Sequence, residues 1–99
     1  MTATSQAVEA ATSVASSFSS ETNNDGLVGL AFDTINTASP SKVPTFVDNV
    51  KASLPSPIFA AYLKKGTAGS YDFGYIDTNK YSGALTYVPV NTANGFWYV

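Results

Sequence analysis

Short apolar runs separated by turn-forming residues are the feature that most limits what this chain can fold into. After Pro57 the turns at Lys64–Gly69 and Asp77–Lys80 divide stretches rich in aromatic and β-branched residues, a pattern typical of strands. The stretches are Ile58–Leu63, Tyr71–Ile76, Ala84–Val90 and Phe96–Val99. This spacing predicts an antiparallel β-meander in the second half of the chain.

The first half predicts two further strands. Ser5–Thr12 is made mostly of small and β-branched residues, and we interpret it as a strand. Ser19–Gly26 clusters Ser, Asn, Asp and Gly, which favours a loop. Leu27–Phe32 is a short continuous apolar run between turn signals, as in strands buried on both faces. We expect it to be the most buried segment.

One short helix is predicted between two prolines. Pro44 suits a first helical turn, where its missing N–H costs little. Apolar residues then recur at helical spacing within Phe46–Leu54, and polar residues occupy the other face. Pro55 and Pro57 end the helix, because proline cannot donate the next backbone hydrogen bond. The predicted fold class is therefore mainly β, an antiparallel sheet with one short helix.

Length and composition predict a single, marginally stable unit. A chain of 99 residues with 44% hydrophobic and 13% aromatic residues is too apolar for intrinsic disorder. A domain of this size buries only about 60–65% of its unfolded surface. The chain begins in strand-like sequence, and Phe96–Val99 has no terminating turn. We therefore expect residues 1–99 to form one partial domain that is cut at both ends.

Several kinds of chemistry are excluded by residues that are absent. Without cysteine or histidine, the chain can form no disulfide, thiol nucleophile, Ser-His dyad or ordinary zinc site. Five lysines, no arginine and a net charge of -2 give no basic surface for nucleic acid or an acidic membrane. We expect no cofactor and no metal, which leaves carboxylates, hydroxyls and lysines for chemistry.

Three motifs occur in a distinctive order along the chain. Asn23–Phe32 contains Asp-Gly-Leu-Val-Gly-Leu-Ala, and Gly95–Trp97 is Gly-Phe-Trp. Between them, Tyr71–Asp77 contains Phe-Gly-Tyr-Ile-Asp and Lys80–Tyr87 is Lys-Tyr-Ser-Gly-Ala-Leu-Thr-Tyr, which together form a hairpin pattern. Together they resemble the fungal pepsin-like aspartic endopeptidases of the penicillopepsin and aspergillopepsin group. The resemblance implies a partial pepsin-like lobe, namely the later part of the N-terminal lobe and the start of the inter-lobe sheet. It implies a secreted parent that hydrolyses peptide or protein substrates beside apolar residues in acid.

The same resemblance implies that the chain carries no catalytic residue. Aspartic peptidases use two carboxylates that share a proton, each in an Asp-Thr-Gly loop, and the family places both loops and the flap tyrosine outside this region. Asp33-Thr34-Ile35 and Asp77-Thr78-Asn79 lack the glycine. We interpret both aspartates as loop-capping residues, and we expect the chain to be inactive alone.

The resemblance implies roles in the parent for four residues, two at the substrate pocket and two in support of the catalytic loop. Phe18 and Leu27 resemble residues that line the subsite before the scissile bond. The alternative interpretation is that both side chains belong to the hydrophobic core. Val28 and Gly29 resemble the element that supports the catalytic loop from behind, where glycine allows close backbone approach.

Other features leave the function class open. Lys64-Lys65 is interpreted as a solvated turn rather than a binding site, and Phe96–Tyr98 as core or interface rather than a stacking surface. Exposed strand edges pair readily with other chains. A small β-rich binding or self-associating protein is therefore the alternative function, and restoration of an active enzyme by separate flanking pieces is a third.

Overall fold

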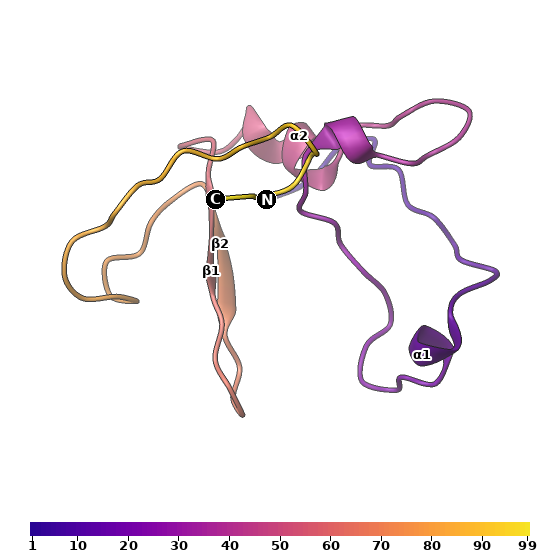
Figure 1. The fold of residues 1–99 in the computed structure, drawn as a ribbon, viewed down its shortest axis with the longest axis horizontal. Helices are drawn as coiled ribbons and strands as arrows, with labels where there is room; N and C mark the ends of the chain where they lie inside the picture. The colour runs from indigo at the N-terminus through magenta and orange to yellow at the C-terminus, as the bar shows by residue number, and fades with distance from the viewer.

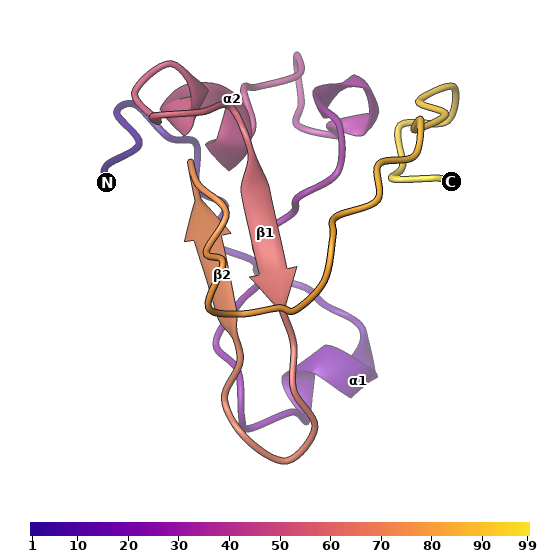
Figure 2. The same cartoon turned by 90° about the vertical axis from the view of Figure 1, so that its left-hand side faces the viewer.

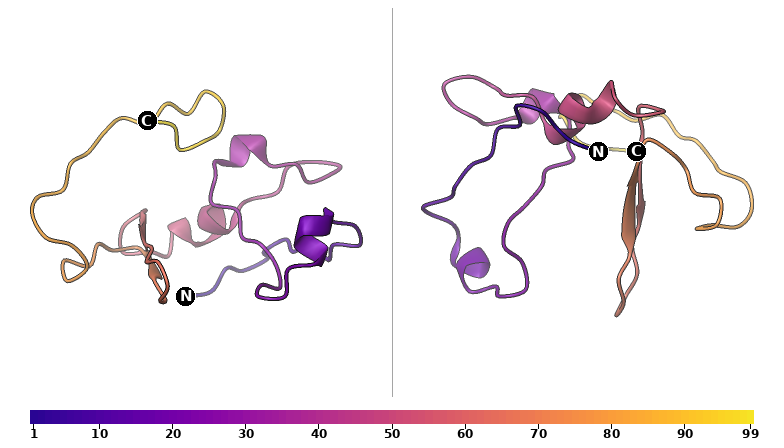
Figure 3. Two further views of the ribbon diagram at one scale, coloured as in Figure 1. Left: turned by 60° about the horizontal axis from the view of Figure 1, so that its bottom comes forward. Right: turned by 180° about the vertical axis from the view of Figure 1, so that it is seen from behind.

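The computed structural model describes residues 1–99, in which regular elements are few and short. In chain order they are α1 (Ser16–Ser19), the 3₁₀ helix η1 (Asp33–Ile35), α2 (Phe46–Lys51), β1 (Phe59–Tyr62) and β2 (Ser70–Phe73). Helices α2 and η1 lie along the top of Figure 1, and three arms extend from there: the loop that carries α1, the β1–β2 hairpin, and residues 76–92. The termini lie next to each other in that view but on opposite sides in Figure 2 and apart in the left view of Figure 3.

The hairpin confirms the predicted antiparallel pair. Its register places Phe59 opposite Phe73 and Tyr62 opposite Ser70. β2 ends earlier than predicted, because Gly74 adopts φ 93° and turns the chain. A Cβ at Gly74 would lie 2.8 Å from Cδ of Pro55, so both the conformation and the space there require glycine.

A row of aromatic rings joins the elements to one another. Phe32 and Trp97 have ring centroids 4.6 Å apart, and Trp97 meets Phe59 edge to face at 5.6 Å. Phe73 continues the row, with centroids 5.9 Å from Phe59 and 5.4 Å from Phe46. Because offset and edge-to-face ring pairs add stabilisation beyond area burial, this row connects the two strands with α2 and the C-terminal segment.

Helix α2 confirms the predicted helix, in a shorter form. It begins at a capping box, in which the Thr45 hydroxyl accepts from the Asp48 N–H at 3.1 Å and the Asp48 carboxylate accepts from the Thr45 N–H at 3.1 Å. Its one fully buried side chain is Val50. Asn49 donates to Oε1 of Gln6 at 2.9 Å and so ties the N-terminal segment to the helix.

The prediction for Leu27–Phe32 was wrong in both respects. The segment belongs to no strand, and Leu27 and Val28 are 76% and 72% exposed. A strand buried on both faces needs neighbouring strands on its edges and layers on its faces. The segment here makes only two long-range hydrogen bonds, from Phe32 N–H to the Gly95 carbonyl and from the Trp97 indole to the Leu30 carbonyl.

Three other predicted strands do not form. Ser5–Thr12, Ala84–Val90 and Phe96–Val99 lie outside the sheet, and the last contributes only an isolated bridge between Asn91 and Tyr98. A single extended segment gains little stability without a hydrogen-bonded neighbour. The antiparallel sheet of this mainly β chain is thus limited to one hairpin.

Surface measures show how open this arrangement is. Four of the 99 residues are buried, and the accessible surface is 8217 Å². A compact protein of this mass exposes about 5,400 Å². The radius of gyration is 15.9 Å, against about 13 Å for a compact domain of this length. Roughly 2,800 Å² of surface is therefore exposed beyond what a compact chain would leave in water.

Candidate functional site

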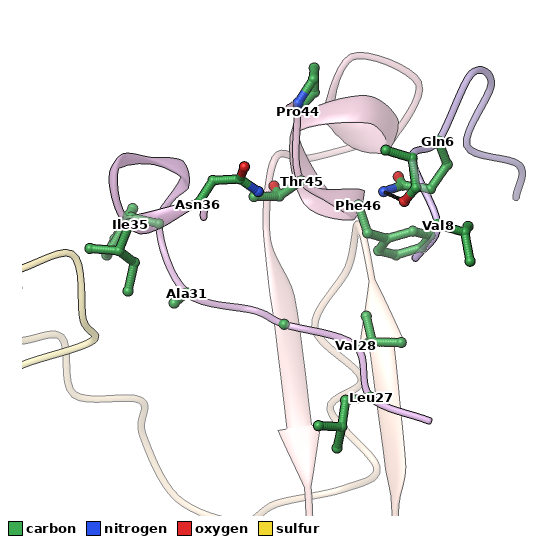
Figure 4. A pocket seen from close by; sticks show the side chains of 13 residues that line it. Gln6, Val8, Leu27, Val28, Ala31, Ile35, Asn36, Pro44, Thr45 and Phe46 are labelled. Atoms are coloured by element: carbon green, nitrogen blue, oxygen red, sulfur yellow. Dashed lines mark hydrogen bonds between the residues drawn. The ribbon is translucent and has the colours of Figure 1, made fainter. Parts of the chain in front are cut away.

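An apolar cleft lies between residues 27–36 and the start of α2 (Figure 4). Its volume is about 440 Å³. Val8 approaches from the N-terminal segment, Phe46 from α2 and Ile35 from η1. The full lining is Gln6, Ala7, Val8, Leu27, Val28, Gly29, Ala31, Phe32, Ile35, Asn36, Pro44, Thr45 and Phe46. Such a lining suits an apolar group.

The polar side chains at this cleft are already engaged in hydrogen bonds. Gln6 accepts from Asn49, and Thr45 belongs to the capping box. Oδ1 of Asn36 accepts from the backbone N–H groups of Ala38 and Val43 at 3.2 and 3.0 Å. No acid or base lines the cleft, so it can bind but has no group for proton transfer.

Three of the four sequence-predicted site residues come together here. Leu27, Val28 and Gly29 all line the cleft, whereas Phe18 lies in α1 and does not. Phe18 is 47% exposed, so neither it nor Leu27 is a core residue in this structure. No atom lies within 4 Å of a Cβ built at Gly29, and the close approach expected there is not made by this chain. The roles of these four residues toward substrate and catalytic loop remain predictions.

Asp77 lies in a turn and Asp33 in the 3₁₀ helix η1. Oδ1 of Asp77 accepts from the Asn79 N–H at 3.0 Å, which confirms its capping role. The capping role predicted for Asp33 was wrong, because its carbonyl, and not its side chain, accepts from the Asn36 N–H at 3.0 Å. Asp33 borders a second cleft of about 620 Å³ next to Trp97.

Neither aspartate belongs to a wider acidic site. No two carboxylates are hydrogen-bonded to each other, and no three acidic residues gather as a metal site would require. None of the helices has the length and apolar character that a membrane crossing requires.

Sequence reasoning missed a polar cluster on the hairpin. Lys80 forms an ion pair with Oδ2 of Asp72, and the Tyr75 hydroxyl donates to Oδ1 at 2.9 Å. The hydrogen bond from Lys80, followed by that from Tyr75, lowers the pKa of Asp72 below its ordinary value. The hydrogen bond to Asp72 raises the pKa of both partners. The one feature of the sequence that pointed to this cluster was Asp72 itself, a charged residue within a predicted strand rich in aromatic residues.

Comparison with known proteins gives matches along nearly the whole chain. A statistical model of the family "Eukaryotic aspartyl protease" matches residues 1–99. The chain is 60% identical over 97 residues to aspartic protease pepA of Leptosphaeria maculans, and 58% identical over 97 residues to penicillopepsin-1 of Talaromyces stipitatus. It is 55% identical over 97 residues to aspergillopepsin-1 of Emericella nidulans. Each match covers 98% of this chain but only 24–25% of the relative, so the chain spans about a quarter of their length.

Proposed function

Because this chain belongs to the eukaryotic aspartyl protease family, we propose that it acts as one section of a secreted, acid-acting, pepsin-like endopeptidase and hydrolyses no peptide bond by itself. In this proposal, residues 1–99 supply the later part of the N-terminal lobe and the first strands between the lobes. The observation that carries it is a family match over all 99 residues in a sequence that contains no Asp-Thr-Gly.

The inactivity follows from what aspartic proteolysis requires. Two carboxylates about 3 Å apart share one proton, so that one activates water while the other protonates the substrate. Asp33 and Asp77 are each followed by threonine but not by glycine, and each lies in its own turn. No two carboxylates share a hydrogen bond. We therefore propose that other residues of the parent enzyme supply the proton-sharing pair.

The contribution to substrate binding rests on exposed apolar side chains. Leu27 is 76% exposed and borders the apolar cleft, and Phe18 is 47% exposed on α1. Each can therefore meet an apolar substrate residue, and burying one such side chain contributes about 1.5–3 kcal/mol. We propose that both wall the subsite before the scissile bond once the rest of the enzyme is present, with Val28 and Gly29 behind the catalytic loop.

A chimera tests this proposal directly. The matched 97 residues of the Leptosphaeria maculans protease are replaced by the corresponding residues of this chain, and cleavage of fluorogenic peptides is measured at about pH 3–4. We expect pepstatin-sensitive cleavage by the chimera and none by residues 1–99 alone.

Two results would contradict the proposal. Pepstatin-sensitive cleavage by the purified 99-residue chain would show that a working carboxylate pair exists within it. A chimera that folds, as judged by its circular dichroism, yet cleaves no peptide would show that this section cannot serve in such an enzyme.

Self-association is a second candidate function, favoured by the excess of exposed surface. The roughly 2,800 Å² in excess on one chain is at least as much as the about 1,000–2,500 Å² that each partner buries in a large permanent interface. β1 and β2 pair only with each other, so each presents one open edge to another chain. Sedimentation at several concentrations separates this candidate from the first.

A further inference from the structure

The Asp72 cluster lies on the hairpin face opposite the aromatic row. Side chains alternate along a strand, so Phe73 and Asp72 point to opposite faces of β2. Asp72 is only 9% exposed. Directly across the ladder stands Ala60, which offers it no charge or hydrogen bond. The carboxylate therefore depends on partners from outside the sheet.

Those partners, Tyr75 and Lys80, come from the segment that follows β2. Lys80 binds Oδ2 of Asp72 and also donates to the Ser70 hydroxyl at 2.8 Å. Tyr75 donates to Oδ1 at 2.9 Å. Both carboxylate oxygens are thus occupied, each by a different side chain. Asp77, the other charged group that acts on Lys80 and Tyr75, uses its carboxylate to cap the turn.

We infer that Asp72, Tyr75 and Lys80 form a clasp that holds the turn at residues 77–80 against β2. Apart from this clasp and the bond from Lys80 to the Ser70 hydroxyl, the turn makes only local hydrogen bonds, such as that from the Lys80 N–H to the Asp77 carbonyl at 3.1 Å. Loss of the clasp would therefore free the turn while leaving the β1–β2 ladder intact.

The electrostatics make the clasp resistant to acid. Hydrogen bonds to the ionised form favour that form, and the bonds from Lys80 and Tyr75 hold the pKa of Asp72 below the ordinary aspartate value of about 3.9. A carboxylate with a lowered pKa stabilises the fold above the ordinary value, and this stability is lost as the pH falls through the lower, folded-state pKa. The clasp thus remains charged in acid that already protonates an ordinary aspartate.

The value of such a clasp rests on the proposed function, since a secreted acid protease works in the range where ordinary aspartates titrate. The presence of the clasp does not rest on it, because its groups all lie within this chain. Its test therefore needs no peptidase activity, and its failure would leave the proposed function standing.

The test is a carboxyl ¹³C NMR titration of the 99-residue chain from about pH 2 to 7, a range that brackets the ordinary aspartate pKa. We expect Asp72 to titrate below the ordinary aspartate value of about 3.9. In Lys80→Met the titration of Asp72 should move up toward that ordinary value, and at pH 5 the amides of residues 77–80 should become more mobile in ¹⁵N relaxation.

Tyr75→Phe removes one hydrogen bond and keeps the ring, so it serves where Lys80→Met fails to fold. It should move the Asp72 titration in the same direction by a smaller amount. The clasp is refuted if Asp72 titrates at or above the ordinary aspartate value of about 3.9 in the unmodified chain. It is equally refuted if the turn in folded Lys80→Met is as rigid as before.

Discussion

At the scale of single residues, Leu27 carries the most weight in the proposed substrate pocket. The residue lies directly after the Asp25-Gly26 turn and is exposed beside an apolar cleft. Exposed leucines are common on protein surfaces and mean little alone. Here the exposure has meaning because Val28 and Gly29, which the family resemblance singles out with Leu27, line the same cleft.

Leu27→Ala in the active chimera should lower kcat/KM for peptides with an apolar residue before the scissile bond. The lost burial of about 1.5–3 kcal/mol corresponds to roughly tenfold or more. Leu63→Ala is the matched control, since Leu63 is 69% exposed and lies outside the clefts. Equal effects of the two substitutions on kcat/KM would exclude Leu27 from the substrate pocket.

At the scale of elements, α2 is stabilised mainly by its first turn. The helix is six residues long, and isolated helices of this length are not stable in water. The reciprocal hydrogen bonds between Thr45 and Asp48 satisfy two backbone donors at its start. The helix in turn supplies Val50 and Phe46, which packs on Phe73.

Thr45→Ala should therefore destabilise the fold by about 1 kcal/mol, the usual cost of losing an N-cap hydroxyl. Urea unfolding followed by circular dichroism measures the change. Thr12→Ala is the control, because Thr12 is exposed and makes no hydrogen bond. A Thr45→Ala variant as stable as Thr12→Ala would show that α2 does not need its cap.

At the scale of the whole molecule, three extended segments project from a small region around α2 and η1. The aromatic row gathers segments from distant parts of the sequence, yet Trp97 stays 53% exposed. Apolar surface of this extent usually marks an interaction site. Either further parts of a protease or other copies of the chain can cover it.

Sedimentation velocity of the 99-residue chain distinguishes these two outcomes. Self-association predicts a sedimentation coefficient that rises with concentration, since mass action favours the assembled state. Lysine substitution at Ala61 on β1 should reduce the rise, because an edge charge blocks strand pairing. Ala93→Lys, on the exposed loop before Gly95, is the control. A single species at all concentrations would remove self-association and leave the chain as part of a larger fold.

Local sequence signals predicted part of the candidate site as well as part of the fold. The Asp25-Gly26 turn and the apolar residues after it led to Leu27, Val28 and Gly29, which do share a cleft. The Asp72 clasp could not be predicted from the sequence, because no spacing rule relates an aspartate in a strand to a lysine eight residues later in a turn. Its geometry depends on how the chain folds back after Gly74.

By itself, the sequence determined the features that depend on interactions between residues close together in the chain. Thr45 set the start of α2, the polar Lys64–Gly69 turn set the hairpin, and the missing glycine after Asp33-Thr34 and Asp77-Thr78 removed the catalytic motif. Only the tertiary structure decided which apolar segments became strands and which stayed exposed. The physical reason is that a strand is stabilised by hydrogen bonds to a neighbouring strand. The residues of a segment do not determine whether another strand lies beside it.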